Sequence, residues 1–160
     1  MFFFWVFLLA AVPVPAPVAG SFGWPLAPPQ VTRRFDAPPE PWLPGHRGVD
    51  LGGAPGLTVR AAGSGTVVFA GLVAGRGVVS VAHPGGLRST YEPVTASAAV
   101  GDVVATGEPL GVLEPGHAGC PVDACLHWGV RRGKDYLDPL ALLGLGRVRL
   151  LPMPGVQQGG

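Results

Sequence analysis

Short apolar stretches separated by Gly and Pro recur along the chain from residue 48 onward. Such runs, each bounded by turn-forming residues, are typical of β-strands. Pro84, Gly85 and Gly86 are predicted to form a hairpin-type turn between two of them. The pattern predicts strands at residues 57–61, 65–70, 77–83, 87–94, 102–105, 109–113 and 125–131.

Apolar residues at helical spacing occur only at residues 138–144. There Asp138 can cap a helix, Pro139 fits the first helical position and Gly144 can end it. With many short strands and one short helix, the chain is predicted to be all-β, a small β-sheet sandwich or barrel-sandwich-like domain.

The N-terminal part divides into two segments. Residues 2–12 form an apolar run that is short for a bilayer span and is followed by Pro13, so residues 1–20 are expected to be a secretory signal peptide. Because no Lys or Arg precedes the run, a weak N-terminal membrane anchor is the alternative. The Pro-rich residues 21–45 are expected to wrap the domain and place Trp24 and Trp42 against it, with a short strand at 30–35. A β domain over 46–146 and a flexible tail over 147–160 complete the expected division.

Composition excludes several classes of protein. The chain has 160 residues, enough for one domain with a core, and its 48% apolar and 13% charged residues exclude a disordered polypeptide. The formal net charge is +1 without a basic stripe, so a nucleic-acid partner is not expected. A monomer is expected.

His46 and Asp50 stand four residues apart in a Gly-rich stretch. Because Gly45, Gly48 and Gly52 disfavour a helix, we expect an extended segment entering a turn, with both side chains aimed at a common point.

A second candidate stretch lies far downstream at residues 125–130. If it is a strand, alternation places Leu126, Trp128 and Val130 on one face, and Cys125 and His127 on the other. His46, Asp50 and His127 would then make a three-ligand set of the kind a catalytic zinc uses, with a fourth position left open.

Residues 100–111 resemble the hammerhead turn of barrel-sandwich domains that carry biotin or lipoate. Such carriers need a Lys at a hairpin tip, and the only one here, Lys134, lies elsewhere in the sequence. The resemblance therefore bears on architecture alone.

Several landmarks in order resemble the lysostaphin/LytM family of zinc endopeptidases. They are Gly-His-Arg-Gly-Val-Asp-Leu-Gly at 45–52, Ala61 with the stretch 65–71, Val-Ala-His at 81–83 with Thr-Tyr at 90–91, the stretch 101–111 and Leu-His-Trp-Gly-Val-Arg at 126–131. The resemblance spans residues 24–143 and implies a β-sheet groove with one zinc held by His46, Asp50 and His127. It also implies a substrate peptide in bacterial peptidoglycan, and hence an extracellular or cell-surface location.

This chain departs from the family where the helper histidines belong. Cys125 stands in place of the first His of the closing His-x-His motif, and Pro93 stands where a His follows Tyr91. Other groups that could transfer a proton are Cys125 itself, Glu92, His83 and His117. Glu92 is expected to point away from the face that carries Tyr91.

Cys125 has two incompatible roles. As a thiolate it could coordinate metal or act as a base, whereas a disulfide with Cys120 would make it chemically silent. Because export is expected, the disulfide is the favoured interpretation. Two functions remain open: a zinc endopeptidase acting on wall peptides, or a catalytically degenerate zinc-binding module that binds the wall or regulates other hydrolases. A purely structural β domain is a third reading, which the preserved ligand set disfavours.

Overall fold

The computed structural model describes residues 22–40 and 42–145. The expected signal peptide or anchor (residues 1–20) and the expected tail (residues 147–160) lie entirely outside these residues. Within them, no helix is both long and apolar enough to cross a bilayer.

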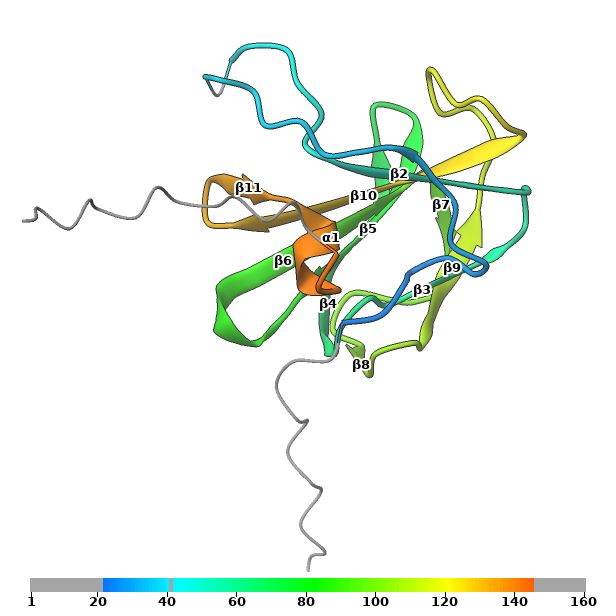
Figure 1. Cartoon of the computed structure of the whole chain (residues 1–160). Coiled ribbons are helices and arrows are strands. Elements are labelled where there is room, and N and C mark those ends of the chain that lie inside the picture. The colour runs from blue at the N-terminus through cyan, green and yellow to red at the C-terminus, as the bar shows by residue number, and fades with distance from the viewer. Residues whose placement is uncertain (1–21, 41, 146–160) are drawn as a thin grey trace, which may run out of the picture.

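Two antiparallel sheets share one core (Figure 1). The large sheet has the strand order β1-β2-β10-β6-β5-β4-β8, with β11 paired to β10, and the small sheet has the order β3-β9-β7. The strands of the large sheet are β1 (Val31–Arg33), β2 (Gly48–Gly53), β4 (Gly65–Val73), β5 (Arg76–Ala82), β6 (Leu87–Glu92), β8 (Val103–Val104), β10 (Ala124–Arg132) and β11 (Asp135–Leu137). Those of the small sheet are β3 (Thr58–Arg60), β7 (Val94–Ala96) and β9 (Pro109–Leu113). The predicted all-β class is confirmed.

The core lies where alternate residues of the two sheets meet. Trp128, Leu126 and Tyr91 point inward from the large sheet, and Val59 and Leu110 do so from the small one, all with no more than 1% exposure. The inward face of β10 is therefore the one that alternation predicted.

One predicted strand, at 87–94, is in fact two. β6 ends at Glu92 in the large sheet and β7 begins at Val94 in the small one. Pro93 lies between them, and because Pro has no N–H to give to a ladder the chain changes sheets there. The predicted strand at 65–70 is longer than expected, because β4 runs on to a two-residue turn at Ala74 and Gly75, both with positive φ.

The single short helix follows the prediction. α1 (Pro139–Leu142) starts after Asp138, whose carboxylate Oδ1 accepts a hydrogen bond of 3.0 Å from the Leu140 N–H. Gly144 then ends it with φ 73°. The predicted turn at 84–86 is a short 3-10 turn (Pro84–Gly86) in which Gly85 and Gly86 have positive φ.

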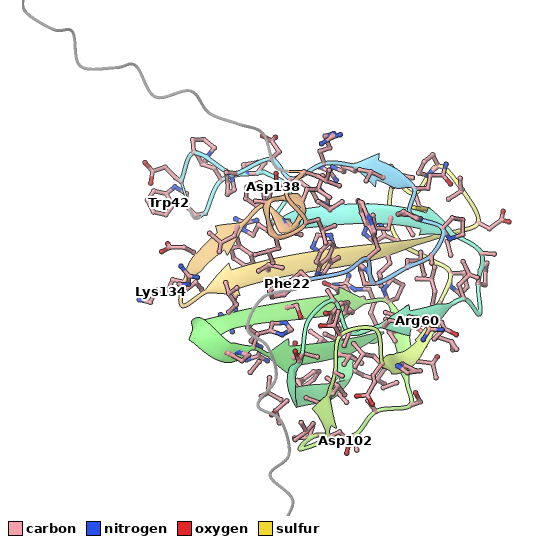
Figure 2. The ribbon with its side chains drawn as sticks, turned by 60° about the horizontal axis from the view of Figure 1, so that its bottom comes forward. Phe22, Trp42, Arg60, Asp102, Lys134 and Asp138 are labelled. Carbon is pink, nitrogen blue, oxygen red and sulfur yellow. A yellow bond between two sulfur atoms is a disulfide. The ribbon has the colours of Figure 1, made fainter. Side chains whose placement is uncertain are left out.

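The Pro-rich approach segment is part of the domain. Leu26 is fully buried, Trp24 packs against the core, and β1 pairs with β2. The expectation for Trp42 is wrong: it is 77% exposed on a loop that projects from the body (Figure 2). With Pro38, Pro39 and Pro44 around it, this loop cannot fold back through a ladder of hydrogen bonds.

Candidate metal centre

Two neighbouring strands bring together residues that are far apart in the sequence. β2 and β10 pair antiparallel, with His127 directly opposite Asp50. Directly opposed residues project from the same face of a sheet. His46 lies just before β2, where it forms an isolated bridge with Asp36. The segment is therefore extended, as expected.

The three predicted ligands converge on one point. Asp50 Oδ1 lies 2.8 Å from His127 Nδ1 and 3.0 Å from His46 Nε2. The two imidazole nitrogens lie 3.2 Å from each other. His46 and Asp50 are buried, whereas the side chain of His127 retains 18% exposure. The centre can thus be reached from outside along His127.

A backbone carbonyl fixes the tautomer of His46. Its Nδ1 lies 2.8 Å from the Arg34 carbonyl oxygen. A carbonyl can only accept, so Nδ1 carries a hydrogen, and in the neutral ring Nε2 presents a lone pair to Asp50 and His127. Acceptors facing one another in this way need a proton or a metal ion between them. The hydrogen bond from His46 Nδ1 to the Arg34 carbonyl is the outer contact expected of a metal-ligating histidine.

Asp50 is held as a carboxylate. Burial by itself would raise the pKa of Asp50, but when no metal is bound and the imidazoles are protonated, hydrogen bonds from His127 and His46, together with the His46 and His117 charges, outweigh it and hold that pKa well below its ordinary value. Asp50 therefore supplies a permanent negative charge beside the imidazoles.

These residues fit a zinc ion. Zinc takes imidazole nitrogen and carboxylate oxygen at roughly 2.0–2.2 Å in a tetrahedron, so neighbouring ligand atoms should be about 3.3 Å apart. The 2.8–3.2 Å separations are slightly shorter, as hydrogen-bonded contacts are. Within the described part of the chain, His46, Asp50 and His127 are also the group of His and acidic residues whose ligand atoms lie close enough together to hold a metal ion.

Gly48 makes room for the His127 ring. A Cβ at this position would lie 2.5 Å from the Trp128 carbonyl oxygen and 2.7 Å from His127 Cε1 and Nε2. We expect Gly48→Ala to lower the free energy of unfolding by about 1–3 kcal/mol and to weaken zinc binding, because the ring must move. Chemical denaturation and a zinc competition titration measure the two effects. Gly71→Ala is the matched control, since its Cβ would make ordinary contact with Phe69 at 3.5 Å. Equal behaviour of the two variants would contradict this role.

His117 reaches the centre from a loop. Its Nε2 lies 3.4 Å from Asp50 Oδ1, and its ring stacks on that of His127 with centroids 6.1 Å apart. The Nδ1 atom is buried and has no hydrogen-bond partner within the part of the chain that the structure describes. Unlike His46, the ring of His117 therefore has no partner at Nδ1 that fixes its tautomer.

Cys125 is not a free thiol in this structure. It is fully buried and joined to Cys120 by a disulfide with Cα atoms 5.7 Å apart. A sulfur in a disulfide can neither coordinate as a thiolate nor act as a base, so the alternative roles weighed for Cys125 do not apply to this oxidised form. The disulfide instead anchors the loop that carries His117. Within that loop, the Cys120 N–H donates a hydrogen bond of 3.3 Å to the His117 carbonyl oxygen.

The disulfide predicts a specific thiol count. Without reductant, the denatured protein should show no reactive thiol, and after reduction it should show two. Reduction should also lower the free energy of unfolding by about 2 kcal/mol, the chain-entropy estimate for so short a loop. A Cys120→Ser/Cys125→Ser double variant should match the reduced protein. A count near two before reduction would rule the bond out.

His83 belongs to a different network. Its Nδ1 lies 2.9 Å from the Ser64 carbonyl oxygen and its Nε2 lies 2.7 Å from Ser89 Oγ, which in turn lies 2.8 Å from the Tyr91 hydroxyl. Burial lowers the pKa of His83, so it is neutral at pH 7. The structure does not bring it to the metal centre. It is a hydrogen-bonded histidine of the interior, packed edge-on against Phe22.

Glu92 lies on the same face of the large sheet as His127. It points away from the Tyr91 face, as expected, but that opposite face is the one that carries the metal centre, because Glu92 pairs directly with His127. Its carboxylate is bound to Arg76 at 3.1 Å. Only the pairing of β6 with β10 places Glu92 beside His127, and the periodicity of either strand does not reveal that pairing.

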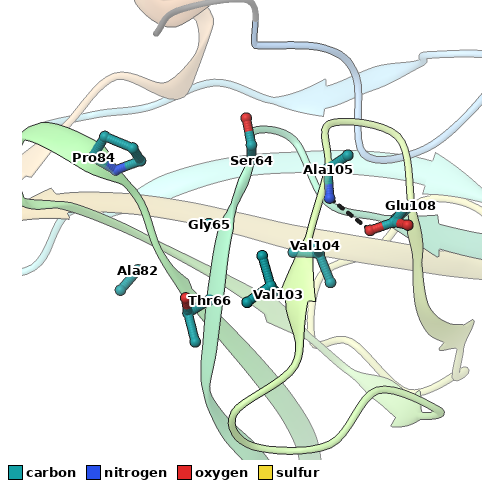
Figure 3. Close-up of a pocket in the computed structure, with 9 residues that line it drawn as sticks. All are labelled: Ser64, Gly65, Thr66, Ala82, Pro84, Val103, Val104, Ala105 and Glu108. Atoms are coloured by element: carbon teal, nitrogen blue, oxygen red, sulfur yellow. Dashed lines mark hydrogen bonds between the residues drawn. The ribbon is translucent and has the colours of Figure 1, made fainter. Parts of the chain in front are cut away.

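A groove of about 420 Å³ opens beside His127. It runs over β6 and β10 and includes Thr90, Gly129 and Arg131. A second pocket, of about 510 Å³, lies between β4 and β8 (Figure 3). Its only acidic lining residue, Glu108, accepts a hydrogen bond from the Ala105 N–H, so this pocket lacks a comparable ligand set.

Comparison with known proteins agrees with this geometry. Residues 44–139 match peptidase family M23. The uncharacterized protein Rv2891 of Mycobacterium tuberculosis is 55% identical over 151 residues, which is 91% of this chain and 60% of that protein. The chain thus spans about 60% of the length of the curated relatives it matches.

Solved structures share the fold. The SpoIIQ–SpoIIIAH pore-forming complex matches with a TM-score of 0.67 and 22% identity, over 78% of this chain and 92% of the matched chain. Lysostaphin matches with a TM-score of 0.59 and 23% identity, over 81% of this chain and 58% of that chain. The family match covers more than half of the chain and includes every residue of the centre described above, so the chain belongs to peptidase family M23.

Proposed function

We propose that this chain is a zinc-dependent endopeptidase that cuts peptide bonds in bacterial peptidoglycan, outside the cell or at its surface. The observation that carries the proposal is the convergence of His46 Nε2, His127 Nδ1 and Asp50 Oδ1 within 3.2 Å of one another at the end of an open groove. Family membership supports a metallopeptidase-like activity on peptidoglycan.

Each residue of the centre has a distinct role in this proposal. His46, Asp50 and His127 would hold the zinc, with the Arg34 carbonyl orienting His46. Zinc in such a site supplies Lewis acidity for amide hydrolysis. The single carboxylate among the ligands leaves the centre with a net positive charge when zinc is bound, which favours a polarised substrate carbonyl.

His117 would replace the missing helper histidines. Position 125 carries the disulfide and position 93 a proline, so neither has an imidazole. His117 offers its Nε2 to the centre, with 18% of its side chain exposed. Because Nε2 faces the centre and Nδ1 has no partner among the described residues, proton exchange with the centre would take place at Nε2. Its place on a loop anchored by the disulfide keeps it beside Asp50.

The alternative is a non-catalytic zinc-binding module that binds the wall or regulates another hydrolase. It is favoured by the absence of an imidazole at positions 93 and 125, which are Pro and Cys. The fold also occurs in a chain of the SpoIIQ–SpoIIIAH complex, in which two different proteins are assembled. This module would retain the zinc and the groove but would not cleave.

Zymography on purified peptidoglycan tests the proposal. The zinc-loaded chain should clear the gel, a chelator should abolish clearing, and added Zn²⁺ but not Mg²⁺ should restore it, because imidazole ligands favour zinc over the harder magnesium ion. A chain that holds one zinc yet never clears the gel would favour the non-catalytic module. Clearing that persists in chelator would refute the zinc mechanism.

A further inference from the structure

The floor of the groove beside His127 carries two arginines, Arg88 and Arg131, at the end away from His127. Residues of β10 and β6 that share a face alternate with the buried ones, so His127, Gly129 and Arg131 line up opposite Glu92, Thr90 and Arg88. All six line the groove, and the metal centre lies at its His127 end. Gly129 leaves the middle of the floor without a side chain.

Arg88 and Arg131 form a like-charge pair. They are directly opposite each other across β6 and β10. Like charges in this position destabilise a sheet. Burial lowers the pKa of Arg88, and the charge of Arg131 lowers it further. The arrangement therefore costs stability unless something compensates it.

No acid of the described chain compensates this pair. Within residues 22–40 and 42–145, no carboxylate lies within 4.0 Å of either guanidinium. The nearest acid on the same face of β6 in the groove, Glu92, is bound to Arg76. Arg131 donates only a long hydrogen bond, of 3.4 Å, to the Gly133 carbonyl. Both guanidinium groups thus have donors available on the groove side.

The wall of the groove adds a further cation. Arg47 lines it next to Tyr136, with its Cζ 5.8 Å from the centre of that ring. Tyr136 pairs with Arg131 across β10 and β11. The part of the groove away from His127 is therefore positively charged on its floor, where Arg88 and Arg131 lie.

We propose that Arg88 and Arg131 bind a carboxylate of the substrate, so that the groove selects acidic peptides; this subsite rests on the proposed peptidase function. Guanidinium groups bind carboxylates through paired, charge-assisted hydrogen bonds. Arg131 is the fourth residue after His127 along β10, a span of about 13 Å. An extended peptide covers that distance in about four residues. The recognised carboxylate should therefore lie no more than about four residues from the bond placed at the centre.

A binding titration with the zinc-loaded full chain tests the subsite. The probe is a peptidoglycan stem tetrapeptide with all its carboxyl groups free. Two further forms are amidated, one only at the C-terminal carboxyl and the other only at the remaining carboxyls, and they distinguish the two sources of the carboxylate. One amidated form should bind at least about tenfold more weakly than the free peptide, and the difference should shrink as salt is added.

Variants link this discrimination to the two arginines. In Arg88→Gln and Arg131→Gln, the free peptide and the sensitive amidated form should bind almost equally. Arg132→Gln is the matched control, since Arg132 is the next residue of β10 and lies outside the groove. Thermal unfolding gives a second readout: both groove variants should be at least as stable as the wild type, because each removes a like-charge contact.

Several outcomes would overturn the subsite. Equal binding of all peptide forms to the wild type would do so, as would unchanged discrimination in both arginine variants or a lack of any binding. Loss of stability in the variants would make the pair structural. Failure of the peptidase proposal looks different: the chain would discriminate between the peptides as expected and yet clear no peptidoglycan in the gel.

Discussion

Asp50→Ala is expected to reduce the zinc content of the purified chain from one ion per molecule to a small fraction of that, and to abolish hydrolysis of peptidoglycan. The reason lies in the geometry of the centre. Asp50 Oδ1 is the atom that both His46 and His127 approach, at 3.0 and 2.8 Å, and it carries the only negative charge among the three ligands. Without it, two neutral imidazoles remain, which hold zinc far less tightly. Elemental analysis and release of dye-labelled peptidoglycan measure the two effects.

Two further variants show whether the effects of Asp50→Ala arise from the metal centre or from a general loss of structure. Asp135→Ala changes an exposed carboxylate on β11 and should leave both zinc content and hydrolysis unchanged. His127→Ala should reproduce the loss of zinc, because it removes the ligand supplied by the partner strand. If Asp50→Ala retained a full zinc ion, the three residues would not be the metal centre.

His117→Ala is expected to slow hydrolysis by about 10²–10⁴-fold, the usual contribution of a positioned acid–base group, while zinc content stays close to that of the wild type. The imidazole is placed to exchange a proton with a group at the centre but is not one of the three converging ligands. Turnover of labelled peptidoglycan and zinc content, measured on the same preparation, test both parts.

Ala118→Ser is the matched control for His117→Ala, since it alters the exposed neighbouring residue of the same loop. It should keep wild-type turnover. Hydrolysis at the wild-type rate in His117→Ala would show that proton transfer occurs elsewhere, with Glu92 as the next candidate. A parallel loss of zinc would instead make His117 a fourth ligand.

The result for His117→Ala also leads to an expectation for the disulfide. If His117 matters, reduction of the Cys120–Cys125 bond should lower turnover as well, because the loop then loses its attachment to β10. Cys125 would thus anchor the loop that brings His117 to the centre.

Local sequence determined the inward face of β10, the helix cap and the direction of the His46 and Asp50 side chains. Each depends on short-range chemistry: alternation sets the inward face of β10, and Asp138 and Pro139 start α1 where they stand. His46 and Asp50 are close in the chain, so an extended backbone is enough to direct both to one place. The disulfide between Cys120 and Cys125 is local in the same sense, with five residues of separation.

Only the tertiary structure decided which strands became neighbours and which loops reached the centre. Pairing of β10 with β6 places Glu92 on the metal face and sets Arg88 against Arg131, although no pattern within either strand encodes that register. The loop position of His117 and the exposure of Trp42 likewise depend on how distant segments pack. The physical reason is that periodicity specifies the face of a residue, whereas long-range strand pairing specifies what that face meets.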